Sequence, residues 1–113
     1  MHEYSLVQAL LERVEQEARA RNASAVHRIW VRIGALSGVE PELLASAYDI
    51  CRGETLCRVA ELTIRKVQVR WACPQCDATI PQGAVLRCPA CDRPARLDSG
   101  DEILLERIEM EVA

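Results

Sequence analysis

Four of the six cysteines lie in two short motifs that could together bind one metal ion. Cys73-Pro-Gln-Cys76 and Cys88-Pro-Ala-Cys91 are CxxC pairs with eleven residues between them. Each pair can fold as a tight turn that presents two sulfurs on one side, so two facing pairs offer four thiolates around a tetrahedral ion. Soft tetrahedral sulfur suits zinc, the commoner structural choice, and also a single iron of rubredoxin type. Because four protein ligands leave no open position, we expect a structural metal site rather than a catalytic one.

The remaining cysteines, Cys51 and Cys57, are assigned no ligand role. Cys51 falls on the expected apolar face of a helix, where a small buried hydrophobic residue is the ordinary account. Cys57 lies near a loop. A thiol-redox role for either CxxC pair is the weaker interpretation, since one pair would suffice for that chemistry.

The start of the chain is a second candidate metal site. The amine of Met1 and the amide nitrogen and imidazole Nδ1 of His2 can close adjoining five- and six-membered chelate rings. These three nitrogens lie in one plane, which matches the square-planar preference of Ni(II) or Cu(II). The amide of Glu3 could supply the fourth nitrogen, and a carboxylate could join an expanded shell. The other histidine, His27, is expected to be an ordinary surface residue.

The composition limits the kinds of protein to which these sites can belong. With 113 residues, the chain is one domain or one small core with a metal-stapled appendage. Its net charge of -3 disfavours bulk attraction to nucleic acid or to an anionic membrane. It shows no secretory signal and no apolar run of the ~20 residues that span a bilayer, so we expect a cytoplasmic protein. Without phenylalanine the core must be aliphatic and small, and a structural metal would help to stabilise it.

Two amphipathic helices should position these residues. The first is predicted over residues 4–21, where apolar residues recur every four positions. The second begins at Pro41 and runs to about Arg52. Its expected apolar stripe consists of Leu43, Leu44, Ala47, Ile50 and Cys51.

Three strands complete the expected elements. Residues 27–34 alternate, with Ile29, Val31 and Ile33 on the buried face. Residues 61–71 change phase, so we place a bulge or bend near Arg65 and Lys66. The first half of this strand should pair in the main core, and the second half should lead to a separate module. The last strand is predicted over residues 102–112, with Leu104, Ile108, Met110 and Val112 on one face.

These elements divide the chain into two predicted domains. Residues 72–98 hold both CxxC pairs, four of the five prolines and little helical periodicity, so we expect an inserted metal ribbon. Residues 1–71 and 99–113 should form a single α+β domain.

Several of these features together resemble the HypA/HybF family, the nickel chaperones of hydrogenase maturation. They are the opening Met-His-Glu-Tyr-Ser-Leu, the strand ending Ile33-Gly34, the following Ser37 and Glu40, and the paired CxxC motifs. The likeness covers the whole chain in order. It implies a fold of two helices on a three-stranded antiparallel sheet, with a zinc ribbon inserted before the last strand.

The resemblance also implies the site residues. Nickel would bind at His2 and the N-terminus, and zinc would bind at Cys73, Cys76, Cys88 and Cys91. Some members carry Asp at the position of Glu40, near the nickel; the longer Glu40 could still reach the metal, or it could cap the second helix. Histidines that lie beside the Cys motifs in some members, and are proposed to couple the two metal sites, are missing from this chain.

The function implied is that of a metallochaperone, not an enzyme. It would take up Ni(II) at the N-terminus and deliver it to the precursor of a nickel-iron hydrogenase large subunit, with a nickel GTPase of the HypB type as partner. Urease as recipient and a homodimeric state are left open. The alternative is a zinc-ribbon module that binds protein or nucleic acid, although 8 acidic against 4 basic side chains in residues 72–113 argue against nucleic acid. An enzyme is disfavoured because the sequence offers no nucleophile with a base, no Gly-rich phosphate loop and no metal site with an open position.

Overall fold

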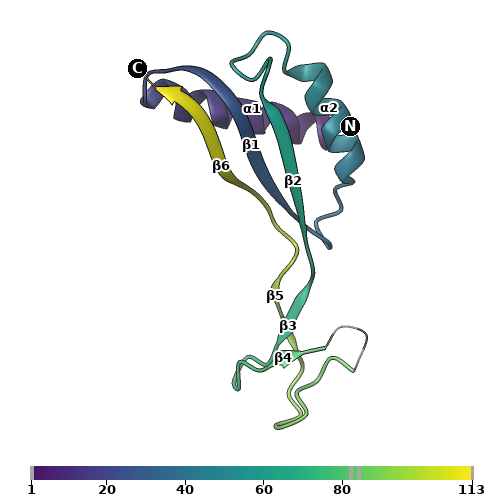
Figure 1. Cartoon of the computed structure of the whole chain (residues 1–113). Coiled ribbons are helices and arrows are strands. Elements are labelled where there is room, and N and C mark those ends of the chain that lie inside the picture. The colour runs from purple at the N-terminus through teal and green to yellow at the C-terminus, as the bar shows by residue number, and fades with distance from the viewer. Residues whose placement is uncertain (1, 82, 84, 113) are drawn as a thin grey trace.

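The computed structural model describes residues 2–81, 83 and 85–112. In this part of the chain the elements are α1 (His2–Ala20), β1 (Ala23–Gly34), α2 (Pro41–Cys51), β2 (Glu61–Val67), β3 (Arg70–Ala72), β4 (Thr79–Ile80), β5 (Arg96–Ser99) and β6 (Ile103–Val112). They form an elongated molecule of 54 × 30 × 17 Å, with both helices and the sheet β2-β1-β6 at one end and the sheet β4-β3-β5 at the other (Figure 1). The predicted α+β architecture, with two helices on a three-stranded sheet and an inserted cysteine ribbon, is confirmed.

Helix α1 begins at His2, two residues before its predicted start. Its buried stripe has the spacing of one helix face and consists of Val7, Leu11, Val14 and Ala18. Asn22 follows in the left-handed conformation, with φ 54°, and ends the helix. Within the described residues, neither helix is long and apolar enough to cross a membrane.

The main sheet is mixed, so the antiparallel arrangement expected for it is wrong for one of its two pairings. The central strand β1 pairs antiparallel with β6, which places Ile29 opposite Ile108. It pairs parallel with β2, which places Ile29 opposite Leu62. The reason is that residues 35–60, which contain α2, form a crossover back to the end of the sheet where β1 began. β2 therefore enters the sheet in the same direction as β1.

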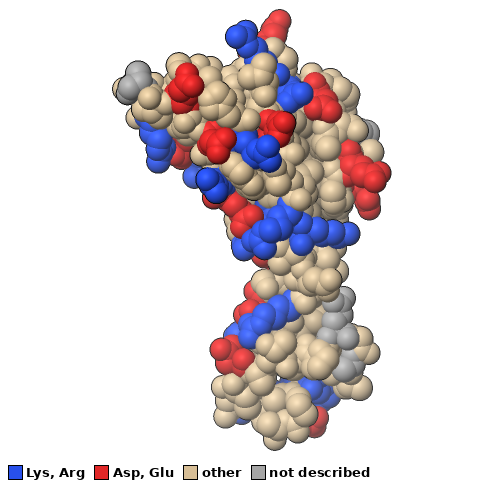
Figure 2. Space-filling view, viewed as in Figure 1, with Lys and Arg blue, Asp and Glu red and all other residues tan. Residues whose placement is uncertain are grey.

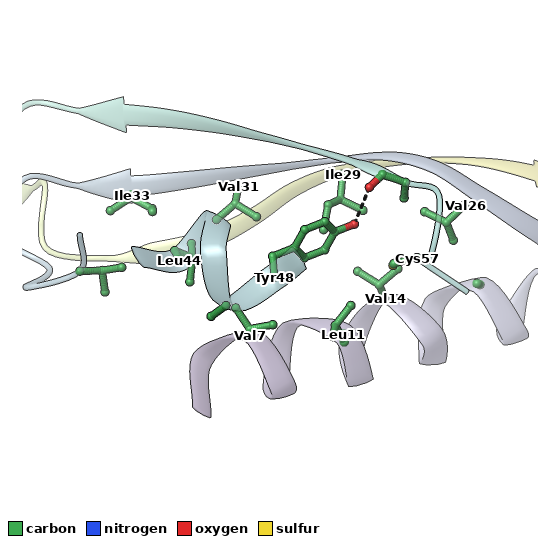
Figure 3. Close-up of a cluster of buried hydrophobic side chains, with 14 residues drawn as sticks. Val7, Leu11, Val14, Val26, Ile29, Val31, Ile33, Leu44, Tyr48 and Cys57 are labelled. Carbon is green, nitrogen blue, oxygen red and sulfur yellow. Dashed lines mark hydrogen bonds between the residues drawn. The ribbon is translucent and has the colours of Figure 1, made fainter. Parts of the chain in front are cut away.

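Helix α2 is anchored by Tyr48, which the predicted apolar stripe did not include. Its hydroxyl is buried and donates a 2.8 Å hydrogen bond to the carbonyl of Ala60, just before β2 (Figure 3). Burial raises the pKa of Tyr48 well above its ordinary value, so the hydroxyl keeps its proton. Arg52 donates to the same carbonyl at 2.6 Å and stacks over the Tyr48 ring. These contacts fix the loop that joins α2 to β2.

The buried face of α2 therefore differs from the predicted one. Leu44, Ala47 and Tyr48 are buried, whereas Leu43 and Ile50 are 47% and 67% exposed. The pattern misleads because this helix carries apolar residues around most of its circumference, so periodicity alone does not select one face.

The predicted face of β6 is also partly wrong. Leu105 and Ile108 pack against the core, whereas Leu104 and Val112 are 42% and 51% exposed. Register shifts in the pairing of β6 with β1 interrupt the two-residue alternation. An irregularity of this kind moves the following side chains to the other face of the sheet.

The chain leaves the main sheet at Gln68 and Val69, between β2 and β3, and not near Arg65 and Lys66 as predicted. β2 pairs in the main sheet, whereas β3 pairs with β4 and β5. The expected separation of the two halves of this segment is therefore confirmed, but it falls a few residues later.

The returning chain crosses β1 through a close contact of two glycines. The amide of Gly34 donates to the carbonyl of Glu102 at 2.9 Å, and the amide of Ala35 donates to the carbonyl of Val67 at 2.9 Å. A Cβ atom on Gly34 would lie 2.2 Å from the carbonyl carbon of Gly100. Gly100 itself has a φ of 110°, which L side chains rarely adopt. Both connections to the second sheet are thus held against the end of β1.

The face of the main sheet away from the helices is polar, as the alternation in β1 predicts. Trp30 lies between the guanidinium groups of Arg28 and Arg107, which are 5.6 and 4.6 Å from its ring centroid. Arg65 donates to Glu106 at 2.7 Å and lowers the pKa of that carboxyl. Because these groups are largely exposed, we expect each pair to contribute little to the free energy of unfolding.

Substituting Gly34→Ala should destabilise the metal-loaded protein by about 1–3 kcal/mol, because the new methyl group forces the two crossing backbones apart. Gly53→Ala is the matched control: a Cβ atom there meets nothing within 4 Å, so we expect no loss and up to ~1 kcal/mol of gain. Urea unfolding monitored by circular dichroism measures both. Equal midpoints for the two variants would contradict the close crossing.

Candidate metal sites

The two CxxC pairs form turns with the same backbone hydrogen bonds. In the first, the carbonyl of Cys73 accepts from the amide of Asp77 at 2.9 Å, and the Cys73 amide donates to the carbonyl of residue 78 at 3.0 Å. In the second, the carbonyl of Cys88 accepts from the amide of Asp92 at 2.8 Å, and the Cys88 amide donates to the carbonyl of residue 93 at 2.8 Å. Because the two turns have the same backbone hydrogen bonds, each places the sulfurs of its two cysteines in the same relative position.

Asp77 and Asp92 let each turn close, and the sequence analysis missed them. Their φ values are 56° and 60°, in the left-handed region that aspartate tolerates better than most residues. The signal was present, since the motif is Cys-Pro-x-Cys-Asp in both copies.

The second sheet brings the two turns together. The first turn connects β3 to β4, and the second turn precedes β5, which pairs with the other edge of β3. As a result the sulfur atoms of Cys73, Cys76, Cys88 and Cys91 all lie within 4.8 Å of one another. Sulfurs bound to one zinc ion at ~2.3 Å in a tetrahedron would be about 3.8 Å apart, so the four residues fit a tetrahedral metal site.

The protein surrounds this cluster with few apolar side chains. Cys73, Cys88 and Ile80 are its buried members, and Trp71 and Ala95 are among the partly buried residues that pack against them. Such a small cluster lacks the apolar surface needed to hold a sheet of two- to four-residue strands. A metal ion bound by four thiolates would supply the missing stabilisation.

The thiols of Cys73 and Cys76 differ in pKa. The amide of Cys76 donates to the sulfur of Cys73 at 3.3 Å and lowers the pKa of the Cys73 thiol to about 6. Hydrogen bonding to Cys91 raises the pKa of the Cys76 thiol to about 12. At neutral pH the Cys73 thiolate therefore lies beside the protonated thiol of Cys76, and a divalent cation that binds both sulfurs displaces that proton.

The other cysteines lie outside this cluster, in the helical part of the protein. Cys57 is fully buried, and burial raises the pKa of its thiol. Cys51 is half-buried at the end of α2. A buried, protonated thiol is a poor metal ligand, so Cys57 belongs to the apolar core. No ligand role for either was predicted.

The N-terminal site lies at the opposite end of the molecule from the cysteines (Figure 1). His2 is exposed and is the first residue of α1, whereas the side chain of Glu3 is buried. The first amides of a helix have no acceptor within the helix, so the amide nitrogens of His2 and Glu3 are not used by its ladder. Met1, whose amine belongs to the predicted chelate, lies outside the described residues.

Glu40 and His27 have different surroundings. Glu40 is the exposed N-cap residue of α2, but its side chain makes no capping hydrogen bond, so the predicted capping role is not seen. His27 is exposed on β1, with its Nε2 atom 3.4 Å from a carboxylate oxygen of Glu111. Neither residue belongs to the cysteine cluster.

Fold and sites together define a small metal-binding protein with a cysteine ribbon. Residues 1–110 match the family described as "Hydrogenase/urease nickel incorporation, metallochaperone, hypA". The chain therefore belongs to the HypA family, nickel metallochaperones of hydrogenase maturation, and the predicted resemblance is confirmed. Membership in this family implies partners in the maturation machinery.

Relatives and solved structures agree over nearly the full length. The hydrogenase maturation factor HypA of Shewanella oneidensis is 39% identical, over all of this chain and 98% of its own. That of Wolinella succinogenes is 39% identical, over 98% and 96% of the two chains. The solution structure of the Ni metallochaperone HypA from Helicobacter pylori is similar with a TM-score of 0.75 at 30% identity, covering 98% of each chain. Another HypA solution structure has a TM-score of 0.82 at 31% identity, covering 97% of this chain and 96% of its own.

Substituting Cys88→Ser should release the bound metal and unfold β3, β4 and β5, while α1, α2 and the main sheet stay folded, because the ribbon has no sufficient apolar core of its own. Emission spectrometry for zinc and iron measures the metal, and two-dimensional amide NMR spectra report on each sheet. Cys51→Ser is the matched control and should keep both metal and ribbon. A ribbon that stays folded without metal would show that the ion is not its main support.

Proposed function

We propose that this protein carries Ni(II) on its first residues. The ligands are the amine of Met1, the amide and imidazole nitrogens of His2 and the amide of Glu3. The observation that supports this most directly is the placement of an exposed histidine as the first residue of α1, where the helix leaves its amides without acceptors. Four nitrogens in a plane suit Ni(II).

Carboxylates at the same end of the molecule could extend this ligand set. The carboxylate of Glu3 belongs to the residue that supplies the last nitrogen. We propose Glu40 as a further ligand: its side chain is exposed and makes no capping bond, and it precedes a helix that packs against α1. The exposed carboxylate of Glu40 would raise the coordination number above four during transfer, whereas the side chain of Glu3 is buried.

We propose that Cys73, Cys76, Cys88 and Cys91 bind one structural Zn(II). Their mutual spacing supports a tetrahedral ion, and four thiolates leave no open position for chemistry. We further propose that residues 72–98 form an inserted zinc-ribbon domain and that residues 1–71 and 99–113 form the nickel-binding domain. The change of sheets at Gln68 and Val69 and the crossing at Gly100 lie close to these bounds.

The proposed mechanism is ligand exchange, without catalysis. A planar chelate at the end of a chain binds tightly as a whole, yet one donor at a time can be replaced by a ligand of the acceptor. Both tight binding and release are then available without a covalent step. The proposed acceptor is the precursor of a nickel-iron hydrogenase large subunit, and the proposed partner is a nickel GTPase of the HypB type. We expect this exchange to take place in the cytoplasm.

Substituting His2→Ala should reduce nickel affinity at least tenfold, because it removes one equatorial ligand and its chelate ring. The zinc content and the fold should not change. His27→Ala, the only other histidine, is the matched control and should bind nickel like the unmodified protein. Isothermal titration of untagged, zinc-loaded protein measures the affinity. Equal affinities for the two variants would rule out a nickel site at His2.

Nickel affinity should fall as the pH is lowered from about 8 to about 6. Protons compete with the metal for an amine and an imidazole, which as classes titrate near pH 8 and 6.5. The same titration repeated across this range provides the measurement, and it should also detect protons released into the buffer. An affinity that does not change with pH would contradict an amine-imidazole chelate.

A further inference from the structure

Helix α2 presents a second apolar surface that the protein does not cover. Leu44, Ala47 and Tyr48 already fill the core, yet Leu43 and Ile50 are 47% and 67% exposed. These two residues are seven positions apart, so they lie two turns apart on one face of the helix. A face of this kind is typical of a helix that is buried on two sides, and here only one side is buried.

The charged groups around this surface are acidic. Glu40, Glu42, Asp49 and Glu54 are all exposed, and every residue from 40 to 54 is described. The one basic residue in the segment, Arg52, donates to the Ala60 carbonyl, lies over the Tyr48 ring and pairs with Asp49 at 3.5 Å. Among the described residues, the negative charge without an ion-pair partner therefore belongs to Glu40, Glu42 and Glu54. Figure 2 shows acidic side chains at the right-hand edge of the molecule, over α2. The surface therefore combines apolar side chains with a negative rim.

A groove of about 660 Å³ continues this surface between α1 and the end of α2. Its lining includes Leu11 and Cys51, which are apolar, and Glu12 and Glu15 from the outer side of α1. Glu15 is paired with Arg19 at 2.8 Å, whereas among the described residues Glu12 has no ion-pair partner. Arg19 also lines the groove, so its further negative charge comes from Glu12, and its apolar part lies at Leu11 and Cys51, at the end of α2.

This surface lies close to the proposed nickel ligands. Val7 of α1 packs under α2, beside Leu44 and Tyr48 (Figure 3). His2 is five residues before Val7, which is about 7.5 Å along the helix axis. A partner seated on α2 would therefore reach the N-terminus.

We propose that the exposed face of α2 and the adjoining groove, here called the α2 surface, dock a partner protein that presents apolar side chains flanked by lysine and arginine. This inference rests on the proposed function, since it places the partner next to the nickel that it receives. Charge complementarity selects the occupant. A second copy of this chain would bring the same acidic rim against itself in a two-fold contact, which the like charges oppose.

The test uses two synthetic 18-residue amphipathic helical peptides, one of leucine and lysine and one of leucine and glutamate. Each is titrated into ¹⁵N-labelled, zinc-loaded protein and followed by NMR. The lysine peptide should shift the amides of α2 and of the groove, and its binding should weaken as salt is added. Perturbation elsewhere in the protein, or equal binding of the glutamate peptide, would overturn the proposal.

Variants locate the contact on the α2 surface. Leu43→Ser combined with Ile50→Ser should weaken binding of the lysine peptide at least fivefold, and Glu42→Lys should weaken it while improving binding of the glutamate peptide. Leu104→Ser, on β6, is the matched control because Leu104 has a similar exposure, and it should bind within twofold of the original. If Leu43→Ser and Ile50→Ser have no effect, the α2 surface is not the docking site.

Two further measurements distinguish docking of a partner from nickel binding and from self-association of this chain. Nickel titration of the Leu43→Ser, Ile50→Ser variant should give an unchanged affinity, so a failure of docking is distinguishable from a failure of the nickel site. Sedimentation velocity of the unmodified protein and this variant should show the same state of assembly. If instead the unmodified protein is a dimer and the variant is a monomer, the occupant of the α2 surface is a second copy of this chain and the proposal is wrong.

Discussion

The end of β1 is the place on which the rest of the structure depends. β1 is the only strand of the main sheet with a partner on both edges, and the described chain both leaves and re-enters that sheet beside its last residues. The backbones at Gly34 and Gly100 lie too close for any side chain between them. The two connections to the cysteine ribbon are therefore held together, and the ribbon strands begin and end at a common point. Because of this, cysteines from two separate motifs meet in one cluster.

The two candidate metal sites follow different physical rules. The cysteine cluster lies in a small sheet with little apolar packing, so the structural ion that we propose there would take the place of a core, and its four ligands would leave no position for exchange. The N-terminal site is at the exposed start of a helix whose buried stripe is anchored in the main core. The ligands that we propose there could be displaced one at a time without loss of the fold. In the function proposed above, permanent support and temporary carriage of metal are thus assigned to different parts of the molecule, the second sheet and the start of α1.

Helix α2 joins the carrier site to the surface that we assign to a partner. Tyr48 and Arg52 tie one side of it to the start of β2, which leaves Leu43 and Ile50 outside. The resulting apolar face is rimmed by carboxylates and lies near the beginning of α1. A surface of this composition is stable in isolation because its charges keep copies apart, and it becomes buried when a basic partner approaches.

Local patterns were enough to predict the two helices, the strands of the main sheet and the clustering of four cysteines. The CxxC spacing, the histidine at position 2 and the alternation in β1 depend on neighbouring residues, so their chemistry can be read along the chain. Features that depend on distant contacts could not be predicted: the parallel pairing of β2, the buried face of α2 and the irregular face of β6. An all-round apolar helix has no preferred face until a sheet covers one side, and a strand has no direction until its crossover is packed. Tertiary structure alone decided those choices, because only packing distinguishes between faces and directions that the local sequence leaves equivalent.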